Sequence, residues 1–139
     1  VSSFLGDGIM ALFASADGAA LAAIEMVAEL DRFNAESGHD PIAIGVGLNT
    51  GMLMLGTVGA DETMAATVIG DTVNVAARIE GMTKERGEAV LMSQSTHECI
   101  ENDDRFDLRE VGEVRAKGRA KLVTIYAVKR LRAESASDV

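Results

Sequence analysis

Residues 67–78 read TVIGDTVNVAAR, and this stretch sets the organisation of the chain. A short apolar run leads through one glycine to Asp71 and Thr72, either of which can cap the start of a helix. We predict a helix that runs from this cap to about Lys84, because Gly87 then lies where a helix commonly ends.

Asn74 and Arg78 lie four residues apart in this predicted helix, so they share one face. A planar guanidinium beside an amide donor suits the charge that develops on a phosphate oxygen during phosphoryl transfer. The alternative is a solvated helix face on which Arg78 pairs with an acid such as Glu80 or Glu85. The residues alone leave both interpretations open.

The first thirteen residues predict a β-hairpin. Two apolar runs flank Gly6, Asp7 and Gly8, and Asp-Gly between apolar runs is a strong hairpin signal because the tight turn needs a positive φ. A carboxylate at the tip of this hairpin, that of Asp7, can approach a metal ion and the phosphates that the ion carries. Alternatively, Asp7 is present only because Asp-Gly forms good turns.

The remaining pattern predicts strands that alternate with helices. A helix capped by Ser15 or Asp17 runs to about Ser37, where Gly38 can end it. Alternation over residues 42–48 predicts a strand with small residues on one face, against which another element packs closely. The other segments are an apolar run over 52–58, a strand over 89–92, a short helix capped by Ser93 or Ser95 that ends near Ile100, and strands near 106–111 and 122–128. This order indicates an α/β or α+β sheet with helices on one face.

Composition bounds the class of protein. The chain has 139 residues, of which 47% are apolar, and we place one domain at residues 1–128 and a polar tail at residues 129–139. A net charge of −9 without a basic stripe argues against nucleic acid as a partner. The single cysteine, Cys99, has no partner for an intramolecular disulfide, so we expect a reducing compartment, the cytoplasm. No apolar stretch is long enough to span a bilayer, although other regions of the protein can anchor it.

Few other residues are candidates for binding phosphate or metal. Lys117 lies beside a glycine before the last predicted strand and can reach a terminal phosphate, although ordinary turn solvation is the alternative. No glycine-rich stretch ends in Gly-Lys-Ser or Gly-Lys-Thr, so the sequence holds no P-loop. The two histidines, His39 and His97, have no partner residues at metal-binding spacing.

Three segments together resemble a known family. FLGDGIMALF at residues 4–13, GVGLNTG at residues 45–51 and TVIGDTVNVAAR at residues 67–78 occur in one order. In this order they closely resemble the class III adenylyl/guanylyl cyclase homology domain in its bacterial form, and the resemblance runs from Val1 to about Val128. It implies a ferredoxin-like α+β sandwich that works as a head-to-tail homodimer, with active sites at the interface.

The resemblance also implies an activity and a role for each candidate residue. In the family, the 3′-hydroxyl of a nucleoside triphosphate attacks its own α-phosphorus and pyrophosphate leaves, assisted by two divalent ions, Mg²⁺ or Mn²⁺. By the match, Asp7 is a metal ligand, Asn74 orients the ribose, Arg78 stabilises the pentavalent transition state and Lys117 contacts the terminal phosphates. The metal ligands come from one protomer and the other three residues from its partner.

The sequence departs from the family pattern at its start. The family's first metal-binding aspartate lies on a strand upstream of the hairpin, followed by two helices, whereas this sequence begins at the hairpin. We therefore expect the second metal ligand upstream of Val1, and little or no activity from this chain alone. Because that strand is central to the family's sheet, we expect the chain to expose an apolar groove, to exchange elements with another copy, or to borrow a strand.

A second departure concerns recognition of the base. Adenylyl cyclases of this family typically have a lysine four residues before the hairpin aspartate, and Ser3 occupies that position here. The usual partner of that lysine, an aspartate or threonine, corresponds to Thr67. Two hydroxyls can each donate or accept a hydrogen bond, so they do not dictate adenine over guanine as a lysine–aspartate pair does. We expect ATP as the substrate, with GTP as the alternative.

The expected function is thus an adenylate cyclase that makes cyclic AMP for signalling. The alternative from another class is a catalytically silent cyclase-homology module that binds nucleotide or a partner and signals by dimerising, which the intact Asp7, Asn74 and Arg78 argue against. A diguanylate cyclase is disfavoured because residues 5–9 read LGDGI and not Gly-Gly-Asp/Glu-Glu-Phe.

Overall fold

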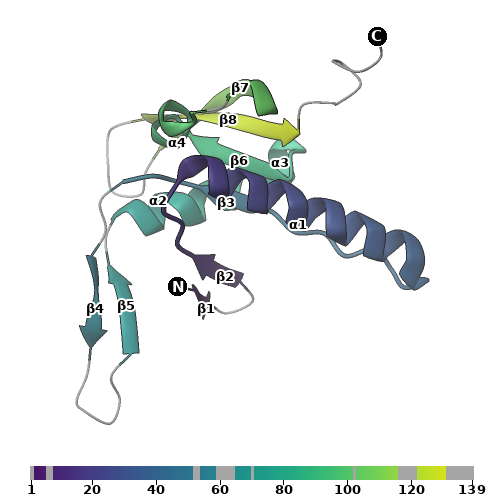
Figure 1. Ribbon diagram of the computed structural model, residues 1–139, viewed down its shortest axis with the longest axis horizontal. Coiled ribbons are helices and arrows are strands. Elements are labelled where there is room, and N and C mark those ends of the chain that lie inside the picture. Colours follow the sequence, from purple (N-terminus) through teal and green to yellow (C-terminus); the bar gives the residue numbers. More distant parts are fainter. Residues whose placement is uncertain are drawn as a thin grey trace.

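The computed structural model describes residues 2–5, 8–51, 54–58, 65–69, 71–101, 103–115 and 122–130. These residues form one four-stranded sheet and two separate two-stranded hairpins, with helices packed around the larger sheet (Figure 1). The strands are β1 (Ser2–Leu5), β2 (Gly8–Ala11), β3 (Val46–Leu48), β4 (Met54–Val58), β5 (Ala65–Ile69), β6 (Val90–Ser93), β7 (Phe106–Arg115) and β8 (Leu122–Arg130). The helices are α1 (Ala16–Ser37), α2 (Asp71–Glu80), α3 (Thr83–Arg86) and α4 (Gln94–Cys99), with one 3-10 turn at Asp103–Arg105.

The larger sheet is mixed and has the strand order β3-β6-β8-β7. β3 pairs parallel with β6, whereas β8 pairs antiparallel with both β6 and β7. The predicted α+β class is therefore confirmed. β8 continues through Lys129 and Arg130, which pair with Asp107 and Phe106, so these two residues belong to the sheet and not to the predicted tail. The rest of that tail lies outside the described residues.

Helices cover both faces of this sheet, as the alternation along β6 shows. Val90 and Met92 pack in one apolar cluster with buried residues of α1. Leu91 points to the opposite face and packs with Val75 and Ile79 of α2. The prediction that the helices lie on one face is therefore wrong. The central strands carry apolar side chains on both sides, and each side needs an apolar cover.

α1 begins and ends where the sequence predicts. Ser15 is its N-cap, and the Oγ of Ser15 accepts a hydrogen bond from the backbone nitrogen of Gly18 at 2.9 Å. Gly38 follows the helix with a φ of 75°, a left-handed conformation that glycine adopts without strain. Within the described ranges, no helix combines the length and the apolar character needed to cross a membrane.

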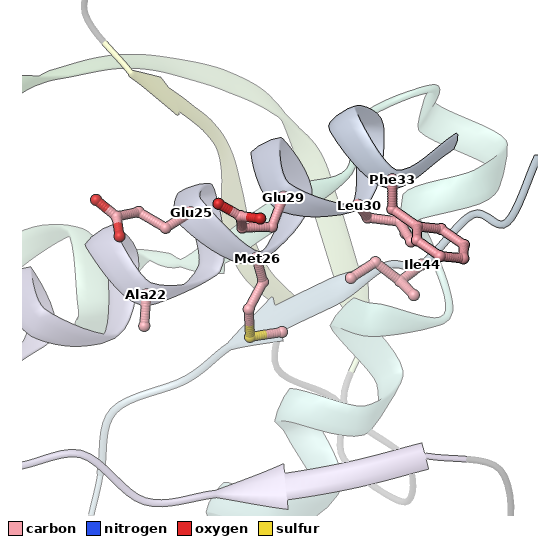
Figure 2. Close-up of a pocket in the computed structure, with 7 residues that line it drawn as sticks. All are labelled: Ala22, Glu25, Met26, Glu29, Leu30, Phe33 and Ile44. Atoms are coloured by element: carbon pink, nitrogen blue, oxygen red, sulfur yellow. The ribbon is translucent and has the colours of Figure 1, made fainter. Parts of the chain in front are cut away.

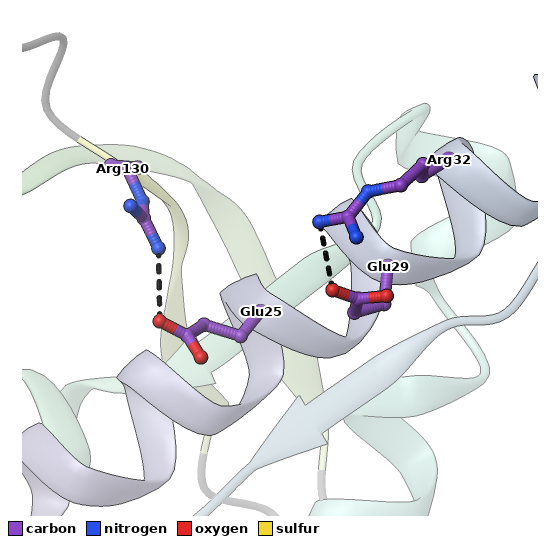
Figure 3. Close-up of polar contacts among 4 residues, drawn as sticks. All are labelled: Glu25, Glu29, Arg32 and Arg130. Carbon is purple, nitrogen blue, oxygen red and sulfur yellow. Dashed lines mark hydrogen bonds and ion pairs between the residues drawn. The ribbon is translucent and has the colours of Figure 1, made fainter.

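Two ion pairs lie along the outer side of α1 (Figure 3). Arg130 Nη2, at the end of β8, is 3.2 Å from Glu25 Oε2, and Arg32 Nη2 is 2.8 Å from Glu29 Oε2. All four side chains are more than half exposed, so solvent screens the attraction and the pairs contribute little to stability. The first pair nonetheless connects the end of the sheet to α1.

β3 is shorter than the strand predicted over residues 42–48. Its pairing begins at Val46, whose backbone nitrogen donates to the carbonyl oxygen of Ala89 at 2.8 Å. Upstream, the side-chain amide of Asn34 binds both backbone groups of Ile42: Nδ2 donates to the carbonyl oxygen at 2.8 Å, and Oδ1 accepts from the nitrogen at 2.9 Å. Asn34 therefore satisfies the backbone that a neighbouring strand would otherwise have paired.

The helix that was predicted to reach Lys84 is divided in two. α2 ends at Glu80, and a turn at residues 81–82 precedes α3. Thr83 Oγ1 donates to the carbonyl oxygen of Glu80 at 2.8 Å, and a continuing helix would have offered that carbonyl to the backbone amide of Lys84. Gly87 follows α3 with a φ of 70°, so the predicted end is confirmed.

Two hairpins lie apart from the larger sheet. β1 and β2 pair antiparallel with Leu5 opposite Gly8, so the predicted N-terminal hairpin is confirmed. Gly6 and Asp7, which connect the two strands, lie outside the described residues. β4 and β5 form the second antiparallel hairpin, which extends away from the sheet in Figure 1, and β5 leads through one residue into α2.

α1 leaves part of its apolar surface exposed. A groove of about 670 Å³ lies between α1 and the segment before β3 (Figure 2). Its lining includes Met26, Phe33 and Ile44, whose side chains are 51%, 49% and 39% exposed. No described strand pairs with the edge of β3 that faces away from β6. An exposed apolar groove, one of the three outcomes predicted from the sequence, is therefore present in the described residues, whereas exchange of elements and borrowing of a strand stay predictions.

Candidate active site

α2 has one buried face and one exposed face. Val75 and Ile79, which are 6% and 0% exposed, enter the apolar cluster under the sheet. Asn74 and Arg78 are exposed and lie one turn apart, as their spacing predicts. Arg78 lies in the last turn, where a positive charge also interacts favourably with the helix dipole. The helix therefore presents an amide and a guanidinium together on its outer side.

The alternative role for Arg78, as half of a surface ion pair, is not observed. Neither Glu80 nor Glu85 pairs with it, and Arg78 forms no ion pair with any residue in the described part of the chain. A guanidinium carries five N–H donors in a fixed planar arrangement. Those of Arg78 are therefore available to an anionic group that comes from outside these ranges.

Glycines allow α2 to lie directly on β3. A Cβ built at Gly47 would lie 2.5 Å from the carbonyl oxygen of Ala76, and closer still to the backbone nitrogen of Glu80. A Cβ at Gly45 would overlap the hydroxyl of Thr83. Only glycine fits at such separations without displacing the helix. The predicted close packing against the small-residue face of this strand is therefore confirmed.

The contact at the start of α2 is polar. Asn49 Nδ2 donates to the carbonyl oxygen of Thr72 in the first turn of α2 at 2.9 Å. A Cβ at Gly51 would lie 2.8 Å from the hydroxyl oxygen of the same threonine. Gly45 thus contacts Thr83, Gly47 contacts the second half of α2, and Asn49 and Gly51 both contact its first turn, so the helix runs antiparallel to the strand. The contact made by Asn49 was not predicted, because the sequence pattern indicated only that small residues share this face.

Two of the other predicted site residues lie in the two hairpins. Ser3 lies on β1 opposite Met10, and Thr67 lies on β5 opposite Gly56. Because β5 leads almost directly into α2, Thr67 is connected to the helix that carries the exposed pair. Asp7 and Lys117 lie outside the described residues.

The expected metal ligand is the carboxylate of Asp7. Among the residues that the structure describes, no three His, Cys, Asp or Glu side chains come together as a metal site. β1 and β2 remain paired as far as Leu5 and Gly8, so the connection that contains Asp7 is two residues long. A carboxylate oxygen is the ligand that hard cations such as Mg²⁺ and Mn²⁺ prefer, so this residue type at this place fits the expected metal.

Comparison with known proteins identifies the family of this mixed α+β domain. A sequence profile of the adenylate and guanylate cyclase catalytic domain matches residues 7–130. An adenylate cyclase of Anabaena cylindrica is 40% identical over 139 residues, a match that covers 93% of this chain and 28% of that relative. The chain therefore belongs to the adenylate and guanylate cyclase catalytic-domain family.

Solved structures of both kinds of cyclase share the fold. A bacterial light-regulated adenylyl cyclase is 26% identical with a TM-score of 0.78, and the match covers 91% of this chain and 37% of that one. The guanylate cyclase domain of RhGC from Catenaria anguillulae, in complex with GTP, is 25% identical with a TM-score of 0.70, covering 93% and 71%. The cyclase fold predicted from the sequence is confirmed. Because the chain spans only 28% of the length of the Anabaena relative, the substrate and assembly of the whole protein are proposals.

Proposed function

We propose that this domain converts ATP to 3′,5′-cyclic AMP and pyrophosphate at the interface of a homodimer, in cyclic-nucleotide signalling. The observation that carries the proposal is the outer face of α2. Asn74 and Arg78 are exposed there, and neither has a partner within the described ranges. The opposite face of the same helix is fixed on β3 by close backbone contact. A rigid support for an unpaired guanidinium and amide is suited to binding a charged substrate.

The proposed reaction is an intramolecular phosphoryl transfer. The 3′-oxygen of the ribose forms a bond to the α-phosphorus, the bond from that phosphorus to the pyrophosphate oxygen breaks, and the 3′ proton passes to solvent. Negative charge develops on the α-phosphoryl oxygens and on the leaving group. Arg78 stabilises this charge through its guanidinium donors, and Asn74 holds the ribose so that the 3′-oxygen lies opposite the leaving group.

The remaining residues complete the site across two protomers. Asp7, with a second carboxylate from upstream sequence, would hold Mg²⁺ or Mn²⁺, which neutralises phosphate charge when bound. Lys117 would contact the terminal phosphates. Asn74, Arg78 and Lys117 come from one protomer and Asp7 from its partner. An exposed guanidinium without an acid partner in its own described chain supports this arrangement.

ATP is the substrate that we propose, and GTP is the second candidate. Similarity to the Anabaena adenylate cyclase favours ATP, and similarity to the guanylate cyclase domain in complex with GTP favours the second candidate. Ser3 and Thr67 occupy the positions that would read the base. Each hydroxyl can donate or accept, so each can serve the exocyclic amine of adenine or the carbonyl of guanine.

The test is cyclic-nucleotide production by the full-length protein, shown to be folded and dimeric, with Mn²⁺ and either ATP or GTP. Arg78→Ala is expected to lower kcat by about 10²–10³-fold, since it removes a donor to the developing charge. Arg32→Ala removes another exposed arginine, one on α1, and is the matched control with unchanged activity. Absence of product from either nucleotide in a folded dimer would instead establish the catalytically silent signalling module.

A further inference from the structure

The side chain of Asn49 connects two helices to the end of β3. Its Nδ2 donates to the carbonyl oxygen of Thr72, in the first turn of α2, at 2.9 Å. Its Oδ1 lies 3.2 Å from the hydroxyl oxygen of Ser95 in α4, whose single hydrogen is shared between this oxygen and the carbonyl oxygen of Thr50. A primary amide offers a donor and an acceptor at once, so a side chain that lacks either one loses a bond here.

A cluster of hydroxyl groups fixes the α4 side of this contact. Ser95 Oγ lies 2.8 Å from the carbonyl oxygen of Thr50 and 2.9 Å from Ser93 Oγ. Thr96 Oγ1 lies 2.8 Å from Thr50 Oγ1 and 3.2 Å from Ser93 Oγ. Ser93 and Thr96 are 0% and 1% exposed, and no buried side-chain polar atom of the described residues lacks a hydrogen bond. A fully satisfied buried network is rigid, so Asn49 connects α2 to a rigid base.

The hydrogen bond from Asn49 to Thr72 and the exposed residues Asn74 and Arg78 belong to the same helix, α2. Thr72 lies two residues before Asn74 and six before Arg78, which places Arg78 about 9 Å further along the axis. Val75 and Ile79 are buried in the apolar cluster, and Gly47 approaches the backbone of Ala76 and Glu80, so packing holds the second half of α2, which carries Arg78. The first turn is held by the close approach of Gly51 to Thr72 and by the amide of Asn49. Loss of that amide bond would therefore loosen the first turn and displace Asn74 more than Arg78.

We propose that Asn49 is a positioning residue for the cyclase reaction, because its amide holds the first turn of α2 and thereby sets where Asn74 meets the nucleotide. This inference rests on the proposed function. Contacts that stabilise a transition state are sensitive to displacements of about 1 Å. Asn49 therefore acts on kcat more than on KM.

Three variants of the full-length protein separate this role from general stability. Asn49→Asp keeps the shape and the acceptor but turns a carboxylate oxygen toward the carbonyl of Thr72. Asn49→His restores an N–H donor on a short side chain and is expected to recover most of the lost function. Thr50→Val is the matched control, since it removes a hydroxyl bond to Thr96 within the same network without touching α2.

The first measurement is hydrogen–deuterium exchange of the backbone amides of α2, which does not depend on catalysis. In Asn49→Asp, the backbone amides of residues 75–78, which donate to the carbonyls of the first turn, are expected to exchange about tenfold faster than in the wild type, the change produced by losing one hydrogen bond. In Thr50→Val, α2 is expected to exchange at the wild-type rate. Unchanged exchange in Asn49→Asp would overturn the positioning role and leave the proposed function intact.

The second measurement is steady-state kinetics with ATP. Asn49→Asp is expected to lower kcat about tenfold with KM within about twofold, and to add no further loss when Asn74→Ala is already present, because both changes act on one contact. Losses that multiply in the double variant would overturn the inference. A wild-type protein without cyclase activity would overturn the proposed function and the positioning role together. The exchange data would then describe only the hydrogen bond between Asn49 and Thr72.

Discussion

Gly47 of β3 and Ala76 of α2 meet through their backbones: a Cβ at Gly47 would lie 2.5 Å from the carbonyl oxygen of Ala76. No side chain therefore separates the strand from the helix at this point. Asn74 and Arg78 lie on the outer side of the same helix. The distance of these two residues from the sheet therefore depends on the close approach of α2 to Gly47, which a Cβ at that position would prevent.

Gly47→Ala is expected to lower the free energy of unfolding by about 1–3 kcal/mol and to reduce cyclase activity, because the added methyl group pushes α2 away from β3. Chemical denaturation and activity of the folded fraction measure the two effects. Gly81→Ala is the matched control for stability, since a Cβ there lies 3.5 Å from its nearest neighbour, the carbonyl oxygen of Arg78. The control is expected to remain within about 0.5 kcal/mol of the wild type. Wild-type stability in Gly47→Ala would contradict the observed contact.

Arg78→Lys is expected to lower kcat about 10²-fold without changing Tm. Lysine keeps the positive charge but lacks the planar arrangement of donors that binds two phosphoryl oxygens at once. Tm should not change because the side chain is exposed and pairs with no described residue. Steady-state kinetics and thermal unfolding of the same preparation test both statements. A lysine variant with wild-type kcat would show that charge alone suffices at this position.

The sequence correctly predicted the ends of helices that are determined by residues within the same helical turn. The N-cap at Ser15 and the glycine at position 38 are each decided within one helical turn, and both predictions are confirmed. The wrong predictions depended on distant residues or on burial. Asn34 replaced the strand partner of Ile42 through a contact eight residues away. Residues 90–92 are all apolar, so their pattern does not distinguish a sheet covered by helices on one face from a sheet covered on both faces.

Only the part of the site that depends on the spacing of residues within one helix could be predicted from the sequence. Asn74 and Arg78 share a face because they are four residues apart in a helix, and a regular helix guarantees that geometry. The role of Asn49 depends on Thr72 and Ser95, which are 23 and 46 residues away in sequence. No periodic pattern connects positions so far apart. Only the folded chain shows why an amide follows the strand at this point.

Ser3→Lys is expected to raise the ratio of kcat/KM for ATP over that for GTP by about tenfold, because a lysine at this position would restore the charged base contact that the family typically has. The wild type is expected to show a smaller preference. Ser2→Lys, which adds the same charge one residue earlier in β1, is the matched control and should leave the ratio unchanged. A strong ATP preference in the wild type would contradict the interpretation that the hydroxyl of Ser3 does not distinguish adenine from guanine.

Asp7→Asn is expected to raise the Mn²⁺ concentration needed for half-maximal activity more than about tenfold and to lower kcat. An amide oxygen is a weaker ligand for a hard cation than a carboxylate of nearly the same size. Activity of the full-length protein as a function of Mn²⁺ concentration measures this effect. Asp31→Asn, a change at an exposed carboxylate of α1, is the control and should leave the metal dependence unchanged. An unaltered metal requirement in Asp7→Asn would remove this residue from the metal site.

Mixing two inactive variants tests whether the site is shared between protomers. If Asp7 acts with Arg78 of the partner subunit, a heterodimer of Asp7→Asn and Arg78→Ala has one site with both lesions and one site with neither. In an equal mixture that exchanges subunits freely, half of the dimers are of this kind and half of their sites are intact. Activity should therefore recover to about a quarter of the wild-type value, since each intact site works independently. No recovery, in a mixture shown by mass to contain heterodimers, would mean that each site is built within one protomer, and the exposed face of α2 would then need another partner.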